Sequence, residues 1–232
     1  MEHLDQIFEA LGPEQDQKVV IAVGRFSVPT IAHYHIINKM KEFARKNKQL
    51  NLSLTPVVMV VAGKDSSKDK LHNPLSAEDR IKFMKASGFA EGVKFLIAPD
   101  AFTAFAIARD KGFEPLVVAA GSDRVDTYLD ILNKNFKSKD GKAIKHLKVS
   151  DLFRDENGEF SKVDLKRMIG DVKEDQTIEL SKVSSSLARL AVQMDEPEVF
   201  NILTGLTKKA ELASLLFNKV KKAMEIGKEG DK

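Results

Sequence analysis

The sequence predicts an α/β fold built on a doubly wound parallel β-sheet, and two observations lead to this prediction. Short, continuous apolar runs recur along the first half of the chain, and such runs are typical of strands buried on both faces of a parallel sheet. Between these runs, apolar residues recur at helical spacing. Strands that alternate with helices in this way indicate βαβ units with right-handed crossovers.

Each expected element follows from its own segment. The apolar runs predict strands at residues 18–24, 56–62, 93–98 and 115–120, and a fifth strand near residues 146–149. Helical spacing, with Ser76 and Asp100 as N-caps, predicts helices at residues 31–45, 76–86, 102–111 and 124–133. Five parallel strands with helices on both faces make a Rossmann-like, doubly wound sheet.

The second half of the chain has a weaker pattern. Residues 150–175 are rich in charge and are expected to be irregular, whereas helical patterns follow from Ser184 to the end. We therefore expect two parts, a Rossmann-like domain over residues 1–195 and a C-terminal helical extension over residues 196–232. The amphipathic last helix can pack on the core or on a second subunit, which leaves a homo-oligomer open.

The composition is that of a soluble globular protein, with 43% hydrophobic and 31% charged residues. The chain has no cysteine, which excludes disulfides, thiolate metal sites and cysteine nucleophiles. Residues 1–11 lack the pattern of a signal peptide, and no apolar run reaches the ~20 residues that span a membrane. We expect a cytoplasmic protein without a membrane partner. The lysines do not alternate with aromatic residues, so we expect no nucleic-acid partner.

The segment after the first expected strand has the features of a phosphate-binding loop. Gly24 permits close approach to the backbone, and the next helix begins near Thr30 with free amides that favour phosphate. His33 lies one turn along the same helix face. Ligands of open parallel sheets bind at the carboxyl ends of the strands. We therefore expect a phosphate here, although the same residues also suit an ordinary strand–loop–helix connection.

Four segments resemble signatures of the nucleotidyltransferase superfamily. Residues 30–33 (Thr-Ile-Ala-His) resemble the (H/T)xGH motif, and residues 73–80 resemble an Asn-Pro segment that ends in arginine, here Arg80. Residues 121–123 (Gly-Ser-Asp) and 183–189 (Val-Ser-Ser-Ser-Leu-Ala-Arg) resemble two further motifs. Their order is similar to that of archaeal-type nicotinamide-mononucleotide adenylyltransferases and of bacteriophage-encoded, cytidylyltransferase-like nucleotidyltransferases.

This resemblance implies an enzyme that moves a nucleoside monophosphate group from a nucleoside triphosphate, with ATP expected, to a phosphate-bearing acceptor such as nicotinamide mononucleotide. Pyrophosphate leaves, and Mg²⁺ binds through the triphosphate, so no metal site made by protein ligands is expected. The implied catalytic residues are His33, Thr30 and Arg189. The implied nucleotide-binding residues are Gly24, Arg25, Phe26, Ala32, Gly121, Ser122, Asp123, Ser184 and Ser185. By position alone, Lys64, Lys68 or Lys70 can close over the phosphates.

Several alternatives stay open at this point. Ala32 stands where the family usually has glycine beside the nucleobase, and its methyl group can crowd the base. A catalytically degenerate nucleotide-binding or structural protein on the same fold is therefore the main alternative. Arg80 also suits a surface ion pair, and Ser184 suits a plain N-cap. The acceptor and the choice of ATP or CTP are open, and a bacteriophage protein would work in the host cytoplasm.

Overall fold

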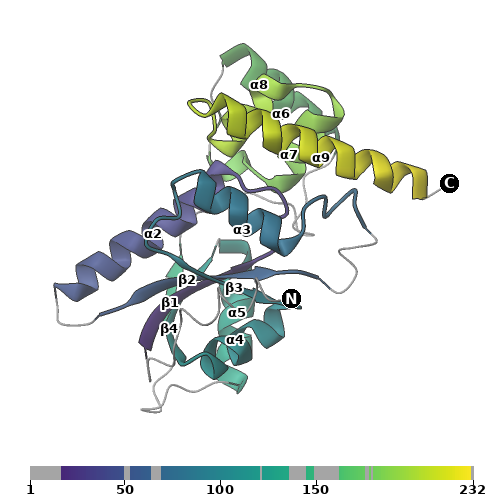
Figure 1. Ribbon diagram of the computed structural model, residues 1–232. Coiled ribbons are helices and arrows are strands. Elements are labelled where there is room, and N and C mark those ends of the chain that lie inside the picture. The colour runs from purple at the N-terminus through teal and green to yellow at the C-terminus, as the bar shows by residue number, and fades with distance from the viewer. Residues whose placement is uncertain are drawn as a thin grey trace.

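The chain folds around one parallel β-sheet with helices on both faces and a further group of helices above it (Figure 1). The computed structural model describes residues 17–49, 53–63, 69–120, 122–135, 145–148, 162–175, 178 and 180–230. The strands are β1 (Gln17–Gly24), β2 (Thr55–Val61), β3 (Lys94–Ala98), β4 (Phe113–Ala120) and β5 (Lys145–Lys148). The helices of the sheet layers are α2 (Ile31–Lys48), α3 (Ala77–Ala86), α4 (Ala101–Asp110) and α5 (Ser122–Asn135). The other helices are α6 (Lys162–Asp175), α7 (Ser185–Gln193), α8 (Pro197–Thr204), α9 (Ala210–Gly230) and the 3₁₀ helix η1 (Leu180–Lys182).

The strands lie in the order β3-β2-β1-β4-β5, and all neighbouring pairs are parallel. From β1, the chain therefore adds β2 and then β3 on one side. It then crosses back and adds β4 and β5 on the other side of β1. The strand order reverses between β1 and β4, which makes the carboxyl ends of these two strands the topological switch point. The predicted α/β fold with a parallel sheet is confirmed.

Strand side chains alternate between two cores because successive residues of a strand point to opposite faces. On one face, Val20, Ala22 and Val58 pack against Ile37 and Met40 of α2. On the other face, the alternate residues of the same strands pack against α4 and α5, around Phe105 and Tyr128. Apolar runs without polar alternation are what a sheet covered on both faces requires.

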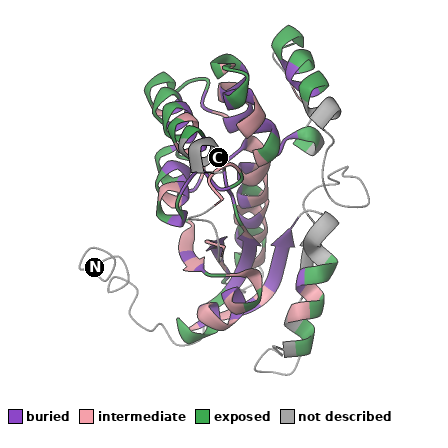
Figure 2. Ribbon diagram, turned by 90° about the vertical axis from the view of Figure 1, so that its right-hand side faces the viewer, coloured by how far each residue is buried: buried purple, intermediate pink, exposed green. Residues whose placement is uncertain are grey.

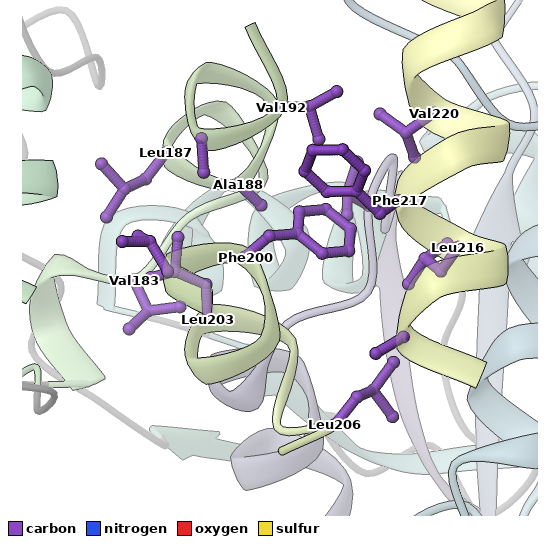
Figure 3. Packing of buried hydrophobic residues seen from close by; sticks show 14 of the residues in the cluster. Val183, Leu187, Ala188, Val192, Phe200, Leu203, Leu206, Leu216, Phe217 and Val220 are labelled. Atoms are coloured by element: carbon purple, nitrogen blue, oxygen red, sulfur yellow. The ribbon is translucent and has the colours of Figure 1, made fainter. Parts of the chain in front are cut away.

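The third core joins helices α6 to α9, and it is seen from close by in Figure 3. Leu187, Phe200 and Phe217 come from three different helices, and the two phenylalanine rings meet edge to face with centroids 5.3 Å apart. Figure 2 shows how buried residues line the inner sides of these helices while exposed residues face outward. The domain boundary at residue 195 stays a prediction. The expectation that residues 150–175 are irregular is wrong for α6.

Helix α9 and the residue before it, Lys209, contact the two ends of α3. Lys219 forms an ion pair with Asp79 in the first turn of α3, and Lys209 Nζ donates to the carbonyl oxygen of Ala86, the last residue of α3, at 3.0 Å. The residue numbers rise along α9 as they fall along α3, so the two helices run antiparallel. No helix among the described residues is long and apolar enough to cross a membrane.

Gly205 connects this helical group to the start of α2. It ends α8 in the left-handed conformation with a φ of 68°, and a Cβ atom there would lie 2.7 Å from Cγ2 of Ile31. A left-handed alanine costs about 1–2 kcal/mol, and forcing a methyl group into packed surroundings costs about 1–3 kcal/mol. We expect Gly205→Ala to lower the free energy of unfolding by about 2–5 kcal/mol, measured by urea denaturation.

Gly92 is the matched control for this substitution. Its φ is 75°, but a Cβ atom there would meet nothing within 4 Å. Gly92→Ala should therefore show the backbone cost alone, about 1–2 kcal/mol. Equal losses of unfolding free energy in the two variants would mean that Ile31 moves aside without cost. The contact between Ile31 and the new methyl group at position 205 would then add nothing to the loss.

Candidate active site

The β1–α2 loop, residues 25–30, lies at the carboxyl edge of the sheet beside the switch point. It follows β1 directly and ends at Thr30, which is the N-cap of α2. The first amides of a helix have no carbonyl partner within the helix, and together with the helix dipole they attract anions. The loop that the sequence singles out thus lies at the edge where ligands of such sheets bind.

Gly24 and Phe26 shape the start of this loop. Phe26 has a φ of 51°, which is uncommon for a residue other than glycine. A Cβ atom on Gly24 would lie 3.1 Å from the Phe26 ring, so the ring fills the space that the glycine leaves. The same ring meets the imidazole of His33 edge to face, with centroids 4.9 Å apart. The absence of a side chain on Gly24 lets Phe26 pack on His33.

Thr30 and His33 form a capping box in the first turn of α2. The backbone N–H of Thr30 donates to Nδ1 of His33 at 3.0 Å, and Thr30 Oγ1 lies 3.0 Å from the same nitrogen. An amide can only donate, so Nδ1 is its acceptor and neutral His33 carries its proton on Nε2. Thr30 is fully buried. Its contacts orient the imidazole and make Nε2–H the donor of His33.

Arg80 joins three backbone segments at this edge of the sheet. Its side chain is fully buried, and it donates to the carbonyl oxygens of Arg25, Val61 and Leu75, each at 2.9 Å. Burial, together with the nearby charge of Arg25, lowers the pKa of Arg80 to about 10. Its Nη2 is buried without a hydrogen-bond partner among the described residues. The surface ion pair considered from the sequence is wrong, because Arg80 holds backbone instead.

The start of α7 lies against the β1–α2 loop. Ser184 is the N-cap, and its Oγ accepts from the amide of Leu187 at 3.1 Å. Ser185 Oγ donates to the carbonyl oxygen of Val28 at 2.9 Å and accepts from the Val28 amide at 3.4 Å. Val28 is also buried in the core of α6 to α9. These contacts bring the N-termini of α2 and α7 to one loop, and both serine hydroxyls serve the protein itself.

Arg189 lies one turn along α7 and also contacts the loop. Its Nη1 donates to Oγ of Ser27 at 2.9 Å, and its Nη2 donates to Oγ of Ser186 at 3.1 Å. The sequence identified Arg189 but not Ser27, which carries no motif signal beyond its place between Phe26 and Val28. The structure therefore brings Arg189 and His33, two of the predicted catalytic residues, to the same short loop, where Arg189 contacts Ser27 and His33 contacts Phe26 and Thr30.

A second pair of side chains lies within electrostatic range of Arg189. His72 Nδ1 is 2.8 and 3.0 Å from the two carboxylate oxygens of Asp69. Burial raises the pKa of Asp69, but the hydrogen bonds and charge of His72, with a contribution from Arg189, lower it below its ordinary value overall. The side chain of His72 is exposed, and that of Asp69 is partly exposed. The Asp-x-x-His spacing was a signal for this pair that the sequence analysis missed.

Ala32 is half-buried and packs against the core of α6 to α9. Its neighbour Ile31 does the same, and Gly205 lies against Ile31. That core also holds Val28, Leu75 and Phe83, so protein partly covers the side chain that replaces the glycine of the motif. This observation gives the methyl group a packing partner that the sequence could not indicate.

The predicted residues near β4 are placed only in part. Helix α5 begins at Ser122, directly after the end of β4, and Asp123 follows in its first turn. The switch point is therefore close to this segment along the chain. Gly121, Lys64, Lys68 and the side chains of Ser122 and Asp123 lie outside the described residues.

Similarity to known proteins shows the family of this chain. One similar solved structure is the "Crystal Structure of Macrolide-efflux Protein from Streptococcus pneumoniae", with 18% identity and a TM-score of 0.36. The match covers 72% of this chain and 56% of that chain, so the chain spans little more than half of that protein. No curated protein matches the sequence significantly. The sequence model of the family described as Cytidylyltransferase-like matches residues 21–189, which include the β1–α2 loop and Arg189. The chain therefore belongs to the Cytidylyltransferase-like family of the nucleotidyltransferase superfamily.

Proposed function

We propose that this protein is a nucleotidyltransferase that moves a nucleoside monophosphate group, with ATP as donor, to a phosphate-bearing acceptor such as nicotinamide mononucleotide. Membership of the Cytidylyltransferase-like family supports the class of reaction. The choice of ATP and of this acceptor follows the resemblance in the sequence motifs. Mg²⁺ would arrive bound to the triphosphate, because it prefers phosphate and water oxygens with few protein ligands.

One observation carries the proposal, namely that the N-termini of α2 and α7 meet at the β1–α2 loop. Ser185 bonds to the loop backbone at Val28, and Arg189 bonds to Ser27. A bound triphosphate would then face two sets of helix amides, the Nε2–H donor of His33 and the guanidinium of Arg189. All of these groups stabilise negative charge. Such a set suits a polyphosphate better than a neutral ligand.

The proposed reaction is an in-line displacement at the α-phosphorus. A phosphate oxygen of the acceptor forms a new bond to this phosphorus, while the bond to the oxygen that bridges the α- and β-phosphates breaks. The electron pair of that bond leaves with pyrophosphate, so no electrons are exchanged with a redox partner. His33 donates to a non-bridging α-phosphate oxygen as charge grows there, and Arg189 holds the β- and γ-phosphates. Catalysis is then positioning and charge stabilisation.

A catalytically degenerate protein on the same fold is the second candidate, and specific contacts favour it. The hydroxyl groups of Thr30, Ser184 and Ser185 are all engaged within the protein. Ala32 replaces the motif glycine. Against it, Ala32 is partly buried against the core that holds Val28, Leu75 and residues of α6 to α9, so protein partly covers its methyl group. The backbone amides and Arg189, rather than the three hydroxyls, would bind phosphate in either case.

Pyrophosphate release tests the proposal. The assay combines Mg²⁺, each of the four nucleoside triphosphates and a panel of phosphate-bearing acceptors led by nicotinamide mononucleotide. We expect release only with one triphosphate and one acceptor together. Arg189→Ala should raise KM for the triphosphate by about 10²-fold, because a charge-assisted pair with phosphate contributes about 1.5–3 kcal/mol.

Arg109→Ala on α4 is the matched control, since this exposed arginine lies on the helix layer of the opposite sheet face. It should leave KM unchanged. Triphosphate binding without pyrophosphate release under any combination would favour the degenerate protein. Release that is insensitive to Arg189→Ala would contradict the role of Arg189.

A further inference from the structure

Ser27 is the buried partner of the arginine that the proposed reaction depends on. Its side chain is only 6% exposed, and its Oγ accepts from Nη1 of Arg189 at 2.9 Å. The two residues are 162 positions apart in the sequence. This hydrogen bond therefore joins the first loop of the sheet domain to the first turns of α7.

The backbone around Ser27 is held by other groups. Arg80 donates to the carbonyl oxygen of Arg25, and Ser185 is bonded to both the amide and the carbonyl of Val28. The hydroxyl of Ser27 is thus not needed to fix the course of the loop. Its hydrogen bond acts on the arginine rather than on the backbone.

An arginine side chain has many rotamers, and it loses this rotamer entropy when it binds a ligand in one orientation. A partner that fixes the guanidinium beforehand removes part of this cost from binding. Ser186 Oγ, at 3.1 Å from Nη2, is a second partner, but Ser186 is exposed at the helix surface. The buried hydroxyl is the stronger constraint, because water competes less for it.

We propose that Ser27 is a positioning residue, which holds the guanidinium of Arg189 against the β1–α2 loop so that it faces the β- and γ-phosphates of the nucleoside triphosphate. This inference rests on the proposed function and deepens it. It gives Ser27 a part in triphosphate affinity, although Ser27 is not among the nucleotide-binding residues that the sequence motifs imply. Ser27 touches no reacting atom in this account and acts through Arg189.

The test is a double-mutant cycle between Ser27 and Arg189, read by binding. Each of the four nucleoside triphosphates is titrated with Mg²⁺, without acceptor, into the full-length protein by calorimetry, and the triphosphate that binds most tightly is used for the cycle. We expect Ser27→Ala to raise Kd about tenfold, the size of one lost hydrogen bond to a charged group. In the Arg189→Ala background the same change should alter Kd less than about twofold, because the residue it acts through is gone.

Two further variants separate positioning from general damage to the loop. Ser27→Thr keeps the hydroxyl and should bind within about threefold of the wild type, whereas Ser186→Ala should have a smaller effect than Ser27→Ala. If turnover is measured, Ser27→Ala should raise KM and leave kcat nearly unchanged, as expected for uniform binding. A circular dichroism melt of each variant shows that it is folded.

The outcomes are distinguishable from failure of the proposed function. If Ser27→Ala changes Kd equally in the wild-type and Arg189→Ala backgrounds, the positioning role is overturned. Triphosphate binding by the wild-type protein would still support the proposed function in that case. Wild-type protein that binds none of the four triphosphates would overturn the proposed function and this inference with it. Non-additive effects on Kd, with Ser27→Thr close to wild type, would establish the role.

Discussion

Replacement of His33 by alanine is expected to lower turnover by about 10²–10³-fold, the loss that follows removal of one donor from a developing oxyanion. The reason lies in the tautomer. Nδ1 accepts from the amide of Thr30, so the proton of the neutral ring sits on Nε2, the atom that would donate to an α-phosphate oxygen. Steady-state pyrophosphate release checks this, with kcat falling more than KM changes, because the donor is strongest in the transition state.

Two variants control for the structural role of His33. His33 also accepts from the backbone at the N-terminus of α2, so its loss costs about 1 kcal/mol of stability as well. Thr30→Ala removes the threonine hydroxyl from the capping box but keeps the imidazole, and should cost turnover about tenfold by loosening the ring. His35→Ala changes the same residue type two positions on, where the side chain leaves the helix in another direction, and should be near wild type. Equal losses in His33→Ala and His35→Ala would contradict the assignment.

The sequence predicted the sheet domain well because its signals are local. Buried parallel strands need continuous apolar runs, and Ser76 and Asp100 cap α3 and α4 as expected. Helix α6 was missed although Leu165, Met168, Ile169 and Val172 recur at the i, i+3, i+4 and i+7 spacing of an amphipathic helix. The charged residues around this stripe, and Gly170 within it, favoured an irregular segment instead. Met168, Ile169 and Val172 are buried, so packing against α7 and α8 stabilises the helix despite its charge and its glycine.

The sequence predicted which residues belong to the candidate site, but not which partners they contact. Spacing shows that His33 lies one turn from Thr30, but not that Thr30 is fully buried and orients the imidazole. Spacing also places serines at the start of α7 without showing that Ser185 bonds to Val28. Such contacts depend on how distant segments meet in space. No local pattern encodes them, and this is why Ser27 was missed.

The buried guanidinium of Arg80 affects the stability of the fold in two opposite ways: burial of its charge lowers stability, and its hydrogen bonds raise it. Burial disfavours its charge, which is why its pKa is lowered to about 10. The unfolded chain keeps the ordinary, higher pKa, so the folded state gains relative stability as pH rises through about 10 and carries the cost of the buried charge at all lower pH values. Against this cost stand three hydrogen bonds, to the carbonyl oxygens of Arg25, Val61 and Leu75.

We expect the hydrogen bonds to outweigh the burial cost, so that Arg80→Met lowers the free energy of unfolding by about 3–5 kcal/mol. A methionine of similar length fills the volume but leaves three carbonyl oxygens buried without donors, at about 1–3 kcal/mol each before relaxation. Urea denaturation at neutral pH measures the loss. Lys82→Met is the matched control, because it removes an exposed positive charge from the same helix and should change stability by less than about 0.5 kcal/mol. If Arg80→Met were neutral or stabilising, the desolvation cost would be the larger effect. The β1–α2 loop would then owe its shape to Ser185 and the Thr30–His33 capping box rather than to Arg80.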